Sequence, residues 1–204
     1  MSMQPAANPG VGFANPVFAS QSVFRAVMNA LARPGSIQSL QAAVAGPATM
    51  PVGMAAIALA LIDHDAPVWL DTSLVKSNEA AGWLKFHTGA PLVGDSAQCA
   101  FALVGDSEAM PRLDRFALGT DEYPDRSTTL IIEVASLTDG SALILSGPGI
   151  RGTTVCCPSG LPDDIAGQLT SNRALFPRGV DLVLVSGSQL LAILRSTHVA
   201  QQGA

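Results

Sequence analysis

Charged side chains are scarce in this chain of 204 residues. Asp, Glu, Lys and Arg together make up 13% of the sequence, against roughly a quarter in an average soluble domain. A surface with so few charges is expected to be covered in part by other chains. We therefore expect an obligate oligomer or a subunit of a complex rather than a solitary monomer.

Long hydrophobic runs are also absent. The longest apolar run, residues 54–62, is shorter than the roughly 20 residues that a membrane-spanning helix needs, and Asp63 follows it directly. Residues 1–12 lack the basic region and apolar block of a signal peptide. The sequence predicts a cytoplasmic protein without a membrane partner.

Cysteine and histidine are each present only three times. Cys156 and Cys157 are adjacent on a predicted strand, where neighbouring side chains point to opposite faces, so that with Cys99 they are expected to be small buried hydrophobic residues. The histidines lie far apart without Cys or Glu at zinc spacing, and no Gly-x-Ser-x-Gly motif is present. We predict no metal site.

Positive charge is the scarcer sign, because the net charge is −5. This balance argues against a nucleic-acid partner, which requires clustered basic residues. Among the basic residues, nine are arginine and only Lys76 and Lys85 are lysine. Arginine suits bidentate contacts with phosphate or carboxylate. A phosphate ligand is therefore possible, although simple ion pairing is favoured.

Hydrophobic periodicity and turn residues predict alternating helices and strands. We expect a flexible N-terminal arm over residues 1–16 and a single α/β domain over residues 17–204, built as a three-layer mixed β-sheet flanked by helices. A hairpin is predicted at Asp139-Gly140 and a helix cap at Ser77. Predicted helices cover 20–33, 51–62, 78–86, 108–116 and 162–174; predicted strands cover 36–40, 68–70, 98–104, 128–135, 142–146, 152–156, 182–185 and 189–193.

Three local motifs favour structural interpretations. Residues 147–152 match the dinucleotide fingerprint, but a strand follows where that fingerprint needs a helix, so a glycine-rich turn is favoured. Residues 63–65 are interpreted as a solvated helix end rather than a metal site. In residues 84–91, His87, Thr88 and Gly89 would suit an anion or a proton transfer, although a helix C-cap is favoured.

The last third of the chain is the most informative. Residues 176–181 lead into two apolar strands that meet at a glycine turn, and Arg178 and Arg195 bracket them. This pattern predicts a buried hairpin that carries charge to its ends, where chemistry or a partner would be met.

A set of short segments, spread over nearly the whole chain, carries a family resemblance: 24–28, 33–37, 63–70, 84–91, 129–137, 147–150, and 176–181 through 195–197. In this order, from about Phe18 to Val199, they resemble the H subunit of the bacterial carbon-phosphorus lyase core complex. Departures from the family pattern are small: Leu194 replaces a proline that is usual before Arg195, and Ser196 replaces a threonine.

The resemblance implies the fold of pyridoxal-phosphate-dependent transferases without the cofactor, and a homodimer. It implies a subunit of the carbon-phosphorus lyase system for organophosphonate catabolism. With its G, I and L partners, such a subunit is needed to form alpha-D-ribose 1-methylphosphonate 5-triphosphate from ATP and methylphosphonate; the J subunit acts later. The chemistry is expected to lie in the I partner, so this chain would be non-catalytic or co-catalytic.

No catalytic residue can be assigned from the resemblance. A pyridoxal Schiff base needs a lysine at the floor of a pocket, and neither lysine is a convincing anchor. From their positions at the ends of predicted elements, six residues are candidates for binding phosphate or a partner's acidic groups: Lys85, His87, Thr88, Arg178, Arg195 and His198.

Two alternatives remain open at this stage. The chain could be a free-standing homodimeric α/β enzyme or small-molecule-binding domain related to pyridoxal-phosphate-dependent transferases. It could also be a purely structural adaptor, required for assembly but without a role in catalysis.

Overall fold

A six-stranded mixed sheet organises the protein, whose computed structural model describes residues 12–42, 44–76 and 78–201. The strand order is β2-β10-β9-β6-β5-β4. Strands β4 (Val68–Leu70), β5 (Phe101–Val104), β6 (Thr129–Glu133) and β9 (Asp181–Ser186) run parallel to one another. Strand β10 (Gln189–Ile193) pairs with β9 in the antiparallel direction, and the edge strand β2 (Gln38–Ser39) pairs antiparallel to β10. The amino ends of β5, β6 and β9 are in register, because Thr129 of β6 pairs with both Phe101 of β5 and Asp181 of β9.

The central strands are apolar on both faces, as is typical of a sheet that is covered on both sides. Leu130 and Ile132 pack into one hydrophobic core, and Ile131 between them packs into the other. The sheet therefore separates two cores.

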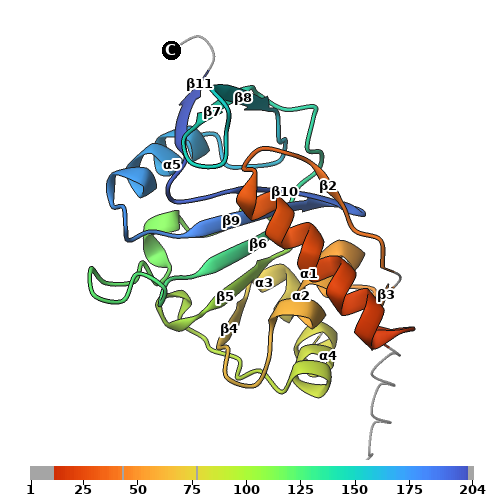
Figure 1. Ribbon diagram of the computed structural model, residues 1–204. Coiled ribbons are helices and arrows are strands. Elements are labelled where there is room, and N and C mark those ends of the chain that lie inside the picture. Colours follow the sequence, from red (N-terminus) through yellow and green to blue (C-terminus); the bar gives the residue numbers. More distant parts are fainter. Residues whose placement is uncertain (1–11, 43, 77, 202–204) are drawn as a thin grey trace, which may run out of the picture.

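Helices cover one face of the sheet (Figure 1). They are α1 (Pro16–Ala32), α2 (Val52–Leu61), the short α3 (Thr72–Val75) and α4 (Glu79–Thr88). The sequence of α2 is apolar on every side, and its residues Gly53–Ala58 are all buried, as expected of an internal helix. At the start of this layer, β1 (Gly12–Phe13) pairs with β3 (Val44–Ala45).

The opposite face carries a second, three-stranded antiparallel sheet and a helix (Figure 1). This small sheet has the order β11-β7-β8, from β7 (Leu143–Ser146), β8 (Thr153–Cys156) and β11 (His198–Gln201). It packs with α5 (Ile165–Ala174) and the 3-10 turn η2 (Leu113–Arg115) over the second core. The fold is thus α/β with mixed sheets flanked by helices, as predicted, but a small sheet shares the second outer layer.

Two predicted elements are wrong. The predicted helix at 108–116 contains only η2, because Pro111 in its interior would remove a helical hydrogen bond. The predicted hairpin at Asp139-Gly140 does not form, since β6 and β7 lie in different sheets. The Gly140 N–H instead donates to Cys157 O at 2.7 Å.

Element boundaries also differ from the prediction. Helix α1 begins at Pro16 rather than Ser20, with proline at its first position. Residues 96–98 form a 3-10 turn before β5 rather than part of the strand. Residues 1–11 of the predicted arm and the predicted cap Ser77 lie outside the described residues, and Gly12–Phe13 form β1. Within the described ranges, no helix has the length and apolar character to cross a membrane.

Candidate functional site

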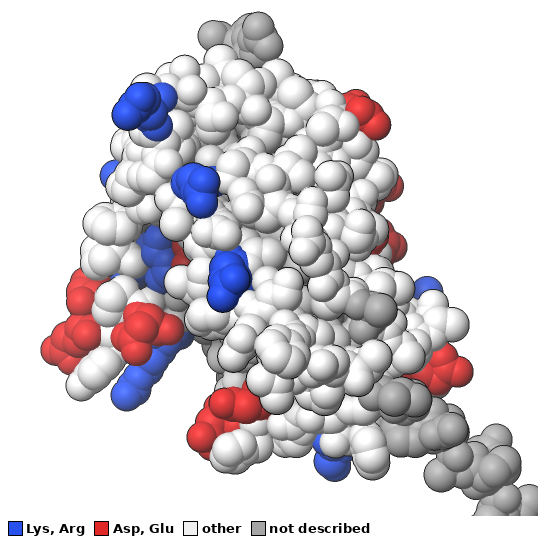
Figure 2. All heavy atoms as spheres, turned by 45° about the vertical axis from the view of Figure 1, so that its right-hand side comes forward, with Lys and Arg blue, Asp and Glu red and all other residues white. Residues whose placement is uncertain are grey.

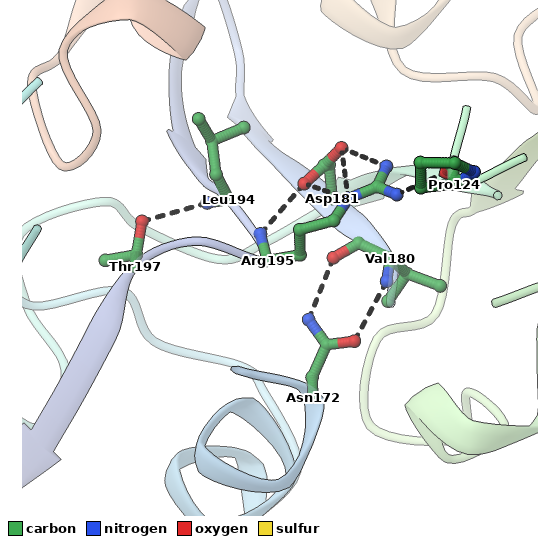
Figure 3. Close-up of polar contacts among 7 residues, drawn as sticks. All are labelled: Pro124, Asn172, Val180, Asp181, Leu194, Arg195 and Thr197. Atoms are coloured by element: carbon green, nitrogen blue, oxygen red, sulfur yellow. Dashed lines mark hydrogen bonds and ion pairs between the residues drawn. The ribbon is translucent and has the colours of Figure 1, made fainter. Parts of the chain in front are cut away.

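Basic side chains gather at the amino end of β9, around the turn that joins it to α5. Asn172 at the end of α5 closes this turn (Figure 3). Its amide Nδ2 donates to Val180 O and its Oδ1 accepts from Val180 N–H, both at 2.9 Å. Gly179 has φ +116°, and a Cβ there would lie 2.6 Å from Asn172 Oδ1. The turn therefore needs glycine at this position.

Arg195, at the end of β10, forms an ion pair with Asp181 at the start of β9 (Figure 3). Arg195 Nε donates to both carboxylate oxygens at 3.1–3.2 Å, and the backbone N–H of Arg195 donates to Asp181 Oδ1 at 2.8 Å. The two side chains are only 16% and 18% exposed. The predicted hairpin of β9 and β10 is thus confirmed, and an internal ion pair closes its open end.

The same guanidinium anchors a loop from elsewhere in the chain. Arg195 Nη1 donates to Pro124 O at 2.6 Å (Figure 3). The Gly179 N–H donates to Leu118 O at 2.8 Å. The loop between η2 and β6 is therefore fixed to the base of β9, and most of the donors of Arg195 are used inside the molecule.

Arg178 forms a weaker contact with the same loop. Its Nε lies 3.3 Å from Asp121 Oδ1, without hydrogen-bond geometry, and the side chains are 40% and 82% exposed. Because Asp121 is largely solvated, this ion pair contributes little stability and leaves Arg178 available to another anion.

Arg173 completes the basic cluster, and sequence reasoning missed it. Its Nη2 lies 3.3 Å from His198 Nε2, and its guanidinium carbon lies 5.1 Å from the centre of the Phe176 ring. Arg173 forms no ion pair with any carboxylate of the described chain. The available signal was its place at the end of the predicted helix, five residues before Arg178.

Lys85, His87 and Thr88 lie elsewhere, at the end of α4. This helix packs into the core on the helical face of the sheet, whereas α5 and β11 lie on the other face. The structure therefore divides the six candidates into two groups separated by the sheet.

The end of α4 is a helix C-cap, as the sequence favoured. Gly89 has φ +70°, and its N–H donates to Lys85 O at 3.1 Å. The Thr88 hydroxyl donates to Leu84 O at 2.7 Å and accepts from Ala90 N–H at 3.1 Å. The His87 ring packs against Trp83, with 4.8 Å between ring centres. Lys85 is exposed at the surface.

The other motifs have the structural roles that the sequence favoured. Residues 147–152 are the turn between β7 and β8. His64 and Asp65 are exposed after α2, and the described residues contain no group of three or more metal-ligating side chains.

The cysteines are free, and Cys99 and Cys156 are buried as predicted. The prediction is wrong for Cys157, which is only partly buried because it lies after the end of β8. Burial raises the pKa of the Cys156 thiol to about 11, so that it stays protonated and unreactive near neutral pH.

Two carboxyl groups lie at the opposite, carboxyl ends of the parallel strands. The buried Asp71 accepts from the backbone N–H groups of Leu74, Gly105 and Asp106 at 2.8–2.9 Å. Glu133 has one buried oxygen without a hydrogen-bond partner, and burial raises its pKa to about 7. Glu133 is therefore a proton-binding group that the sequence alone did not indicate.

Comparison with known proteins finds similarity over nearly the whole chain. The family described as "Bacterial phosphonate metabolism protein (PhnH)" matches residues 11–200. The alpha-D-ribose 1-methylphosphonate 5-triphosphate synthase subunit PhnH of Rhizobium meliloti (strain 1021) is 48% identical over 190 residues, which cover 93% of this chain and 94% of that protein. A putative C-P lyase subunit protein, HtxG of Stutzerimonas stutzeri, is 38% identical over 97 residues, or 48% of this chain and 47% of that protein.

Proposed function

The chain belongs to the PhnH family of bacterial phosphonate metabolism proteins, and we propose that it is a subunit of the carbon-phosphorus lyase system. In this role it is needed, with partner subunits, to form alpha-D-ribose 1-methylphosphonate 5-triphosphate from ATP and methylphosphonate. The observation that carries the proposal is the 48% identity to a named subunit of that synthase over 93% of the chain.

The arginine cluster beside β9 favours a role in binding and assembly rather than in catalysis. Arg173 and Arg178 can bind phosphate oxygens or a partner's carboxylates, and His198 lies beside them. Arg195 contributes by holding the hairpin closed, because Asp181 and Pro124 already occupy its guanidinium. Lys85, His87 and Thr88 form a separate candidate contact for a partner on α4. We assign the bond-breaking chemistry to partner subunits.

The proposal includes a homodimer with G, I, J and L partners, located in the cytoplasm and free of pyridoxal phosphate. The scarcity of charged residues, 13% of the sequence, supports a surface that other chains cover. Exposure of both lysines supports the lack of a Schiff base, since such a base requires a lysine in a shielded pocket.

The decisive test is growth on methylphosphonate as sole phosphorus source in a strain that lacks this reading frame. We expect no growth without the gene and full growth when a plasmid restores it, whereas growth on inorganic phosphate is unaffected. Normal growth on methylphosphonate in the deletion strain would overturn the proposal.

A second test concerns the cluster itself. Arg178→Ala is expected to lower either the yield of the complex in co-purification or the turnover of the purified complex. Arg115→Ala is the matched control, because Arg115 is exposed in η2 and lies outside the cluster. Normal assembly and turnover of the Arg178→Ala complex would remove Arg178 from the proposed binding site.

One observation favours the alternative of a small-molecule-binding domain. An apolar hollow of about 810 Å³ lies beside β4 and is lined by Trp69, Val75 and Lys76 among others. If the isolated chain binds pyridoxal phosphate, borohydride fixes the cofactor onto a lysine and the absorption band persists after dialysis. We expect no such band, and its appearance would favour the alternative.

A further inference from the structure

The amino-terminal part of the chain contains no acidic residue. Residues 1–62 hold no Asp or Glu, although the whole chain has 16 acidic residues and a net charge of −5. The charged residues of this segment are Arg25 and Arg33. One segment of an acidic protein therefore carries only positive charge, and it includes the long surface helix α1.

Helix α1 exposes large apolar side chains to solvent. Its inner side buries Val23 and Val27, whereas Phe18 is 71% exposed and Phe24 is 49% exposed. Val17, Phe24 and Met28 follow the spacing of one helix face, and Ile37 is also exposed shortly after the helix. Exposed aromatic and aliphatic side chains concentrated on one element mark an interaction site.

The surroundings of this apolar surface lack carboxylates. A hollow of about 480 Å³ lies beside α1 and is lined by Phe18, Gln21, Arg25, Asn29 and Gln38 among others. These polar side chains are rich in N–H donors, and Arg25 forms no ion pair with any described residue. Figure 2 shows this side of the molecule as a broad uncharged expanse with isolated basic groups, while acidic groups lie near its borders.

We propose that the exposed face of α1, formed by Val17, Phe18, Phe24, Arg25 and Met28, docks a different protein chain that presents apolar side chains bordered by carboxylates. Charge complementarity selects this partner, because Arg25 and Arg33 have no acidic residue in their own segment to oppose them. A second copy docked helix to helix would bring these arginines together without a compensating carboxylate. The inference rests on the proposed function: the partner is another subunit of the phosphonate system.

The test uses the full chain, tagged and co-expressed with the G, I, J and L subunits. The double variant Phe24→Ser/Met28→Ser is expected to retain the partners at least about tenfold less well, since loss of central apolar anchors costs more than 1.4 kcal/mol, a factor of about ten. The matched control is Val155→Ser, because Val155 is 55% exposed on β8 and lies outside both the proposed face and the candidate contact on α4. Arg25→Glu is expected to weaken retention as well, with Arg151→Glu in the β7–β8 turn as its control.

The outcomes separate the inference from the function on which it rests. If the unmodified chain retains no partner, the proposed function fails. If the unmodified chain retains its partners and the double variant retains them equally, the inference fails alone. A change of the purified chain from dimer to monomer in the double variant, measured by light scattering, would assign the face to a second copy and overturn the inference. Equal circular dichroism and melting of all variants checks that the exposed substitutions leave the fold intact.

Discussion

Arginines at the base of β9 and on α1 differ in what surrounds them. Arg195 is 16% exposed and bonded to Asp181 and Pro124, so its charge is satisfied within the chain. Arg25 is exposed beside large apolar side chains, in a segment without any carboxylate. One arginine holds the fold together, and the other is free to meet another molecule.

The difference shows that residue type and exposure together decide what an arginine does. A shielded ion pair with several hydrogen bonds is costly to break, because the remaining charge stays in a poorly solvated place. An exposed arginine contributes almost nothing to folding. Stability measurements should therefore separate the two regions before any binding measurement is made.

The largest effect is expected from Arg195→Met. The substitution removes the cation that pairs with Asp181, whose side chain is only 18% exposed, and it removes the donor that binds Pro124 O. We therefore expect the free energy of unfolding to fall by about 3 kcal/mol. Urea unfolding followed by circular dichroism measures this change.

A double variant sharpens this result. Asp181→Leu combined with Arg195→Met removes both charges, and should recover part of the lost stability because no charge is left unpaired. If Arg195→Met alone is neutral, the ion pair does not hold the hairpin closed, and the contrast with α1 disappears.

The sequence predicted the local part of this site. The apolar runs at 182–185 and 189–193 with a glycine turn between them specify β9 and β10 because hairpin contacts are close in the chain. The bracketing arginines were also visible. The partner Pro124 was not, since it lies 71 residues from Arg195 and is brought there by the loop before β6.

The failures of prediction have the same origin. Asp139-Gly140 has the local chemistry of a hairpin turn, yet β6 already pairs with β5 and β9 on its two edges. Strand β7 therefore joins β8 and β11 in a second sheet. Local turn preference was overridden by pairing between strands that are distant in sequence, and the grouping of Arg173 with His198 from β11 was hidden for the same reason.

An effect of intermediate size is expected from Glu133, a buried carboxyl group that has no ion-pair partner among the described residues. Burial raises the pKa of Glu133 in the folded state from 4.5 to about 7, so between these values the folded protein holds a proton that the unfolded chain has released. The contribution of Glu133 to stability is present below pH 4.5 and is lost as the pH rises through about 7.

The measurement is the melting temperature of the unmodified chain and of Glu133→Gln at pH 5 and pH 8. The difference between the two proteins should favour the variant more strongly at pH 8, since glutamine stays neutral at both values. Glu122→Gln is the matched control, because Glu122 is exposed and lies in the loop before β6. An identical pH dependence in all three proteins would show that the Glu133 carboxyl group ionises normally.

The smallest effect on stability is expected from Arg178→Ala and Arg25→Ala. Arg178 lies near Arg195 in the fold, but its partner Asp121 is 82% exposed, so we expect a loss below about 1 kcal/mol. Arg25→Ala should change the free energy of unfolding by less than about 0.5 kcal/mol, because Arg25 has no ion pair to lose. Urea unfolding under the conditions used for Arg195→Met measures both. If Arg178→Ala costs as much as Arg195→Met, the cluster beside β9 acts as one structural network, and only α1 retains arginines free for a partner.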